Sequence, residues 1–299
     1  MKFAYYPGCS LNATGIEYNI SAKAVAKHLG IEFWEIPEWN CCGASAAHNT
    51  DPLLALALPA RNLAIAEAKN LDVAVPCAAC FNRLKSAQQA VKKSAATKEK
   101  VNKAIEMDYQ GSNEVKALLD VMTSAVNADM VKEKVVRPLD GLKAASYYGC
   151  LLVRPPGVTQ FDDPEDPQSM DQLMKNIGAD AVDWSFKVEC CGAGHSTAKS
   201  DVGLPMIDSI LADAKVNGAE CIVTACPLCM LNLDMRQKEI EQKNKQSYNL
   251  PIFYFTELMG LSFGYSAKDM GVTKHFVNPM PLLEGKDLLK HPATRRDEA

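Results

Sequence analysis

The chain has 299 residues, enough for two domains of ordinary size that each bury a hydrophobic core. Its 47% hydrophobic and 23% charged residues are typical of a soluble globular protein, and a formal net charge of -4 argues against a nucleic-acid partner. The start lacks the pattern of a signal peptide, and the longest apolar run, LLALAL, is far too short to span a bilayer. We therefore expect a cytoplasmic protein with no transmembrane segment.

The first half of the chain alternates short β-prone runs with segments of helical length. The predicted strands are KFAYY, IEFWEI and LDVAV, at residues 2–6, 31–36 and 71–75. Residues 15–30 and 53–70 have the length and apolar spacing of helices. A fourth strand is expected around residues 105–109, before SNEVKALLDVM. This alternation predicts a parallel sheet covered by helices.

The second half repeats the same alternation. Its predicted strands are AASYYG, AVDWSF, ECIVTA and IFYF, at residues 144–149, 181–186, 220–225 and 252–255. Pro138 and Gly141 interrupt the pattern between the halves. The sequence therefore predicts an α/β protein of two similar repeats, residues 1–140 and 141–299, each a parallel sheet covered by helices.

Eleven cysteines without a secretion signal are better explained as metal ligands or redox groups than as a disulfide framework. Ten of them form two copies of one pattern: a single cysteine, an adjacent pair followed by glycine, and Cys-x-x-Cys. The first copy consists of Cys9, Cys41, Cys42, Cys77 and Cys80, and the second of Cys150, Cys190, Cys191, Cys226 and Cys229. The second copy holds extra residues before its adjacent pair, which we place in a loop at FDDPEDPQS.

Each cysteine element directly follows a predicted strand. The three elements of a repeat should therefore converge at the carboxyl edge of its sheet. Each Cys-x-x-Cys also opens a predicted helix, whose N-terminus favours thiolate over thiol. Buried structural cysteines do not explain ten residues at repeated spacings, and a tetrahedral zinc site would leave one of five ligands idle. An iron–sulfur cluster fits better, although an ordinary cubane needs only four cysteines.

The two cysteine copies resemble the CCG domain repeat, and nearly the whole chain resembles the B-type subunits of heterodisulfide reductases. The resemblance implies that each repeat binds a noncubane [4Fe-4S] cluster through its five cysteines. It also implies a catalytic role in reducing the heterodisulfide of coenzyme M and coenzyme B to two thiols, in methanogenic energy metabolism. The implied partners are the flavoprotein of the A type and the cubane iron–sulfur protein of the C type, with a hydrogenase or formate dehydrogenase in a larger complex.

A second function remains open, because similar repeats occur in glycolate oxidase, lactate utilisation and thiol:fumarate reductase complexes. In such a complex the chain would be an iron–sulfur electron-relay subunit. Two complete repeats without a fused ferredoxin segment favour disulfide reduction over a relay or a metal-stabilised binding module.

Other residues near the cysteines are candidates for smaller roles. His48 and His195 lie just beyond the two Cys-Cys-Gly elements and could donate protons to a product thiolate. The sequence is equally consistent with histidines that only pack against a helix or lie on the surface. The anionic ends of the implied substrate require cationic contacts, for which the candidates are Arg83, Arg154 and Lys199. The eleventh cysteine, Cys221, aligns with Asp72 outside the repeated pattern, so we expect a buried strand residue.

Overall fold

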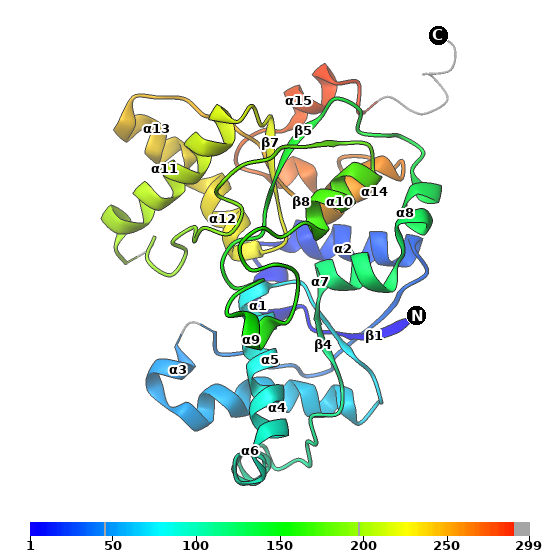
Figure 1. The fold of residues 1–299 in the computed structure, drawn as a ribbon, viewed down its shortest axis with the longest axis vertical. Helices are drawn as coiled ribbons and strands as arrows, with labels where there is room; N and C mark the ends of the chain where they lie inside the picture. Colours follow the sequence, from blue (N-terminus) through cyan, green and yellow to red (C-terminus); the bar gives the residue numbers. More distant parts are fainter. Residues whose placement is uncertain (45, 197, 290–299) are drawn as a thin grey trace.

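The computed structural model describes residues 1–44, 46–196 and 198–289. It contains two four-stranded sheets, each entirely parallel and with the same topology, β2-β1-β3-β4 and β6-β5-β7-β8 (Figure 1). The strands are β1 Lys2–Tyr5, β2 Glu32–Glu35, β3 Val73–Val75, β4 Val115–Ala117, β5 Lys143–Tyr147, β6 Asp180–Ala181, β7 Cys221–Thr224 and β8 Ile252–Tyr254. The predicted α/β architecture of two similar repeats is confirmed.

Helices connect the strands and cover the sheets (Figure 1). In the first repeat they are α1 Gly8–Leu11, α2 Ile16–His28, α3 Ala47–Thr50, α4 Pro52–Glu67, α5 Ala78–Lys93, α6 Ala95–Ile105, α7 Leu118–Asp120, η1 Val121–Ala125 and α8 Ala128–Lys134. In the second they are α9 Pro156–Thr159, α10 Ser169–Asn176, α11 Ser200–Val216, α12 Pro227–Met235, α13 Gln237–Asn244, α14 Phe255–Ser262, η2 Val272–Lys274 and α15 Met280–Gly285. Among the described residues, none of the helices is long and apolar enough to cross a membrane.

The predicted fourth strand of the first repeat is wrong. Residues 105–109 include the last residue of α6 and the turn after it, where Glu106 has a left-handed φ of 54°. The fourth strand is instead β4, inside the segment SNEVKALLDVM, and it pairs with β3 through Val73 and Val115. Its end residues are buried and α7 follows at once, so the strand and helix form one apolar run without a break.

The strand order places a topological switch point in each sheet. From β1 the chain first adds β2 on one side and then crosses to add β3 on the other. Ligands of α/β proteins bind outside the carboxyl ends of the strands at such a point. The cysteine elements follow β1, β2 and β3 in the first repeat and β5, β6 and β7 in the second.

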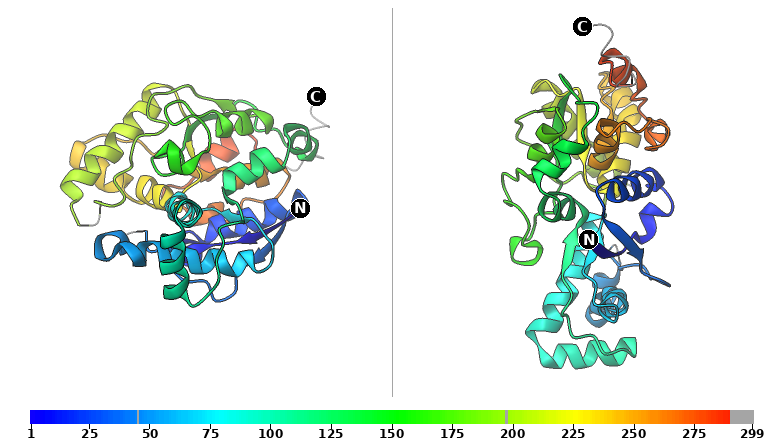
Figure 2. Two further views of the ribbon diagram at one scale, coloured as in Figure 1. Left: turned by 60° about the horizontal axis from the view of Figure 1, so that its bottom comes forward. Right: turned by 90° about the vertical axis from the view of Figure 1, so that its right-hand side faces the viewer.

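The repeats pack closely on each other. Helix α2 of the first repeat lies against α14 of the second, as the blue and orange helices show (Figures 1 and 2). The buried hydroxyls of Ser21 and Thr256 are 2.7 Å apart in this contact, and the rings of Tyr18 and Tyr254 stack at 4.1 Å. The predicted division between residues 140 and 141 stays a prediction.

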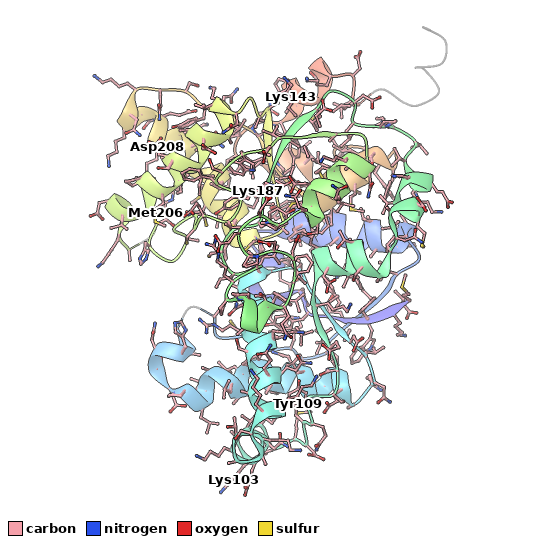
Figure 3. All side chains as sticks on the ribbon, viewed as in Figure 1. Lys103, Tyr109, Lys143, Lys187, Met206 and Asp208 are labelled. Carbon is pink, nitrogen blue, oxygen red and sulfur yellow. The ribbon has the colours of Figure 1, made fainter. Side chains whose placement is uncertain are left out.

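A buried ion pair fixes the acidic loop of the second repeat. Lys187, whose label lies near the centre of Figure 3, has a side chain only 5% exposed. Its Nζ lies 2.9 Å from Asp166 and 3.5 Å from Asp171, and Asp171 also accepts a hydrogen bond from the Tyr148 hydroxyl at 2.7 Å. The Lys187 carbonyl accepts from the amide of Gly149, directly before Cys150. The ion pair therefore supports the backbone next to the second cysteine set.

Replacing Lys187 with methionine should lower the free energy of unfolding by about 3–5 kcal/mol, because the buried carboxylate of Asp171 loses its cation. Chemical denaturation of the anaerobically purified protein, followed by circular dichroism, measures this. Lys103→Met is the matched control, since Lys103 is exposed on α6 and should change stability by less than about 0.5 kcal/mol. Equal stability of the two variants would contradict the role of Lys187.

Candidate metal centre

Three elements carry the cysteines of the first repeat to one end of its sheet. Cys9 lies in α1 after β1, Cys41 and Cys42 lie in the loop after β2, and Cys77 is the N-cap of α5 after β3. The second repeat places its five cysteines on the equivalent elements, with Cys226 as the N-cap of α12. All ten thiols are free.

The thiols form a continuous row through the molecule. In the first set Cys9 interacts with Cys41, Cys42 with Cys80, and Cys80 with Cys77. The second set is arranged in the same way, with interactions between Cys150 and Cys190, Cys191 and Cys229, and Cys229 and Cys226. The two sets meet in the interior, where Cys77 interacts with Cys226. The row is thus mirrored about its centre.

The spacing of the sulfur atoms suits metal ligation. Cys42 Sγ lies 3.3 Å from Cys80 Sγ, and the equivalent distance from Cys191 to Cys229 is 3.7 Å. Two thiolates on one tetrahedral ion, each bound at about 2.3 Å, lie about 3.8 Å apart. Among the described residues, however, no three His, Cys, Asp or Glu side chains surround a single point closely enough to hold one ion. The paired arrangement therefore fits a group with several metal atoms.

The N-terminus of α12 helps to stabilise the thiolate of Cys226 at the centre of the row. The pKa of Cys226 lies well below its ordinary value, because the thiols of Cys229 and Cys77 and the amides of Cys229 and Leu228 stabilise the thiolate. The pKa of Cys77 is raised well above its ordinary value by its interaction with Cys226. The two central thiols thus have pKa values shifted in opposite directions.

The outer thiols show the same pattern of paired pKa shifts. Interaction with the thiol of Cys80 lowers the pKa of Cys42 to about 7, and interaction with Cys150 lowers that of Cys190 to about 6. The pKa values of the partners Cys80 and Cys150 are raised in return. Since thiolate is the form that binds metal, loading both sets with metal must release several protons.

Two equivalent tyrosines, Tyr6 and Tyr147, complete the sites and are not among the predicted site residues. The Tyr6 hydroxyl donates to the carbonyl of Asn40 at 2.8 Å, and the Tyr147 hydroxyl donates to that of Glu189 at 2.6 Å. Each carbonyl belongs to the residue directly before a Cys-Cys pair, so each tyrosine holds the backbone in place where that pair begins. The repeated letters YYPGC and YYGC were the available signal.

Glycine is required beside each tyrosine. Gly8 and Gly149 have left-handed φ angles of 68° and 67°. A Cβ atom on Gly8 would lie 3.2 Å from Cys80 Sγ, and one on Gly149 would lie 3.1 Å from Cys229 Sγ. The missing side chains leave the backbone against the sulfurs.

The structure brings two of the predicted minor candidates together. Arg83 on α5 lies with a guanidinium nitrogen 3.3 Å from Nδ1 of His48, so this contact links α5 to α3. His195 is exposed and close enough to Cys190 for its charge to help lower the thiol pKa. Lys199 is the exposed N-cap of α11, and its amide donates to the His195 carbonyl. Roles for all four in substrate binding or proton transfer stay predictions.

The guanidinium of Arg154 already has hydrogen-bond partners within the protein, so it is not freely available to a substrate. Its guanidinium lies 2.7 Å from Glu165 and donates to the Pro164 carbonyl at 2.9 Å. These groups belong to a mostly apolar hollow of about 440 Å³ that reaches Cys150 and is lined also by Leu151, Pro155 and Pro156. An anionic ligand would have to compete with the carboxylate of Glu165 for Arg154.

Cys221 lies apart from the row. It begins β7, is fully buried, and its thiol is 3.9 Å from the Lys143 carbonyl of the neighbouring strand. Burial raises its pKa. It has the environment expected of a small apolar strand residue.

Comparison with known proteins identifies a family and several relatives of the chain. Residues 3–85 and 144–234 match the cysteine-rich CCG domain family. The chain is 36% identical, over 94% of its length and 99% of the relative, to the membrane anchor protein of the 8-methylmenaquinol:fumarate reductase of Wolinella succinogenes. It is 31% identical, over 94% of its length and 96% of the relative, to the B-type subunit of a ferredoxin:CoB-CoM heterodisulfide reductase of Methanosarcina mazei.

A solved structure shares the fold. A hypothetical protein from Helicobacter pylori superimposes with a TM-score of 0.73 at 15% identity. The match covers 92% of this chain and 52% of that one, so the chain spans about half of its length. This likeness supports the two-repeat architecture.

Proposed function

The chain belongs to the cysteine-rich CCG domain family, and from this membership we propose that each five-cysteine set holds one noncubane [4Fe-4S] cluster. The proposed ligands are Cys9, Cys41, Cys42, Cys77 and Cys80 in the first repeat and Cys150, Cys190, Cys191, Cys226 and Cys229 in the second. When bound, such clusters supply single electrons and iron positions for sulfur ligands. The paired sulfurs and the low pKa values of Cys42, Cys190 and Cys226 suit these ligand roles.

Relatives of the chain belong to reductase complexes, and the chain has a related iron–sulfur redox role. We infer that this role is catalytic: reduction of the coenzyme M–coenzyme B heterodisulfide to two thiols. The observation that carries the inference is the mirrored thiol row, in which equal sets meet at Cys77 and Cys226. A disulfide has two sulfur atoms and needs two electrons, so two equal sites facing each other match its symmetry.

Residues beside the sets would orient the substrate. Arg83 with His48 on the first set, and Lys199 with His195 near the second, offer cations and proton donors to the anionic ends and the product sulfurs. Arg154 would contribute by shaping the hollow at Cys150 while paired with Glu165. A place in methanogenic energy metabolism would follow from this substrate.

A relay function is the second candidate, because one relative at 36% identity belongs to a methylmenaquinol:fumarate reductase. In that case the two sets would pass electrons between partner proteins without cleaving a disulfide. Under either function we propose partners that deliver electrons. For the disulfide reductase these would be a flavoprotein and a cubane iron–sulfur protein, with a hydrogenase or formate dehydrogenase beyond them. Location in the cytoplasm stays a prediction.

Disulfide turnover separates the two functions. Protein purified without oxygen and loaded with iron and sulfide should oxidise reduced methyl viologen when the heterodisulfide is added, forming two thiols for every two electrons. The same protein without iron loading is the control. Electron uptake from viologen without thiol formation, together with electron transfer to fumarate through a reductase partner, would favour the relay.

A further inference from the structure

A group of buried ionisable side chains lies where the repeats meet, outside the thiol row. We name it the acid–histidine cluster: Glu17 of α2, Asp234 of α12, Glu257 of α14 and His275, directly after η2. Glu257 is fully buried, Asp234 and Glu17 are 3% and 7% exposed, and the His275 side chain is 1% exposed. Helices α2 and α14 pack against each other, and Asp234 of α12 is tied to the segment after η2 by its hydrogen bonds from Phe276 and Val277.

Short hydrogen bonds hold the cluster in place. His275 Nε2 lies 2.9 Å from one oxygen of Glu257, whose other oxygen accepts from the amide of Tyr254 at 2.8 Å. Asp234 accepts from the amides of Phe276 and Val277, the two residues after His275. The backbone at Gly271 packs tightly against Glu17, because a Cβ atom added to Gly271 would lie 2.6 Å from the Cβ atom of Glu17. The charges are therefore fixed within the interior.

The cluster contains more negative than positive groups. Three carboxylates face one imidazole, and the nearby cation Lys274, which faces Glu17, is exposed. Burial raises the pKa values of Glu17 and Asp234. Burial alone would lower the pKa of His275, but the carboxylates of Glu257, Asp234 and Glu17 outweigh it and raise the pKa. Protonation is thus favoured at Glu17, Asp234 and His275 relative to the same groups in water.

Two buried polar atoms at the cluster have unused hydrogen-bonding capacity. His275 Nδ1 and the Tyr254 hydroxyl are both buried and have no hydrogen-bond partner within the described parts of the chain. Buried polar atoms without protein partners usually bind internal water, because leaving them unpaired is unfavourable. Water at these atoms would connect the cluster to Tyr254.

Tyr254 leads from the cluster to the centre of the thiol row. A Cβ atom on Gly15 would lie 3.3 Å from the Tyr254 hydroxyl and 3.2 Å from Pro227, the residue after Cys226. Tyr254 also stacks on Tyr18, whose hydroxyl donates to the carbonyl of Ala225, the residue before Cys226. Through Tyr254 and Tyr18, the cluster is therefore connected to the residues on both sides of Cys226 in the second cysteine set.

The first repeat has no equivalent among its described residues. The counterpart of Glu257 is Asp120, since each is the third residue of the helix that follows the fourth strand. Asp120 is partly exposed and lies 3.8 Å from Lys116, which leaves that position close to neutral. The two cysteine sets therefore differ in their electrostatic surroundings although their sulfurs are mirrored.

We propose that the acid–histidine cluster binds one proton when the iron–sulfur site of the second repeat gains an electron. The inference rests on the proposed clusters and deepens the proposed function, because each thiol product needs one proton. The added negative charge near Cys226 favours protonation of a buried acidic group, and by linkage protonation favours reduction. The electron comes from an iron–sulfur donor protein, and the proton enters from solvent at the exposed neighbours Thr273 and Lys274.

Redox titration of the anaerobically purified, iron-loaded protein between pH 6 and 8.5 tests the proposal. In the wild type, one of two one-electron midpoint potentials should fall by up to about 59 mV per pH unit, the value for a tenfold change in proton activity, while the other stays constant. His275→Gln and Glu257→Gln should each abolish most of this slope. His28→Gln is the matched control, since His28 lies in α2 on the ring of Phe263 and should leave the slope intact.

The outcomes are distinct from those of the disulfide assay, because the titration needs no disulfide. Two pH-independent potentials in the wild type would overturn the proposal even if both glutamine variants failed to fold. A slope that persists in both variants, with normal iron content, would also overturn it. Tyr254→Phe should keep the equilibrium slope but slow the approach to it after a pH jump, since the hydroxyl conducts the proton and does not store it.

Discussion

Replacing Cys191 with alanine should reduce the iron content of the anaerobically purified protein from about eight atoms per chain to about four. The equivalent change in the first repeat, Cys42→Ala, should have the same effect. Each of these cysteines pairs with the last cysteine of its own set, at 3.7 Å from Cys229 and 3.3 Å from Cys80. Loss of one ligand should empty one site, and the double variant should contain almost no iron.

Cys221→Ala is the matched control for these variants. It removes a cysteine from the same repeat, but the thiol lies fully buried in β7 against the Lys143 carbonyl and outside the row. Iron and sulfide should stay at the wild-type level, with a modest loss of stability from the small cavity.

Iron and acid-labile sulfide assays, with visible spectra, measure the outcome. Loss of iron in Cys221→Ala would show that the ligand assignment is wrong. Stoichiometric zinc in wild-type protein from its native source would exclude iron–sulfur clusters in both sets. Protein made aerobically would not test the assignment, because exposed Cys9 and Cys41 lie open to oxidation.

The sequence was sufficient to predict the architecture and the grouping of cysteines, because both depend on local order. Thirty-four residues separate Cys42 from Cys77 and also Cys191 from Cys226, and this equal spacing reveals the repeat. Parallel strands then fix which edge the cysteine elements share, whatever the details of the helices. The structure places each element at that edge.

The error at the fourth strand has a local cause. Strand β4 has three residues and continues directly into α7, and periodicity cannot separate a short buried strand from the start of a helix. The segment at 105–109 ends in buried Tyr109, which resembles a strand residue. Its hydroxyl instead donates to Asn113 within a turn.

Contacts between repeats could not be predicted from the repeat itself. Two equal units can face each other in several ways, and the spacing of the cysteines does not show that Cys77 meets Cys226. The acid–histidine cluster depends on the same packing, since Glu17 and His275 lie far apart in sequence and belong to no motif. Tyr6 and Tyr147 were within reach of sequence analysis, because their letters repeat beside the cysteines.

The mirrored sets predict a second large effect, on catalysis. Cys42→Ala and Cys191→Ala should each lower the turnover of the heterodisulfide by about 10³-fold or more, and the double variant should be no worse than either. Components that act as one unit show this non-additivity, because removing one already abolishes the shared step. Under the proposed disulfide reduction, the shared step would be the delivery of two electrons to two sulfur atoms, which one site alone would not support.

Electron uptake should respond differently from turnover in the same variants. Each single variant should still accept about half of the wild-type reducing equivalents from reduced viologen, since the five cysteines of the other set are unchanged. Turnover, electron uptake and iron content measured on one preparation give the comparison, with Cys221→Ala as the control at wild-type values. If one single variant kept wild-type turnover while the other lost it, the chemistry would occur at one set alone, and the other set would not be needed for turnover.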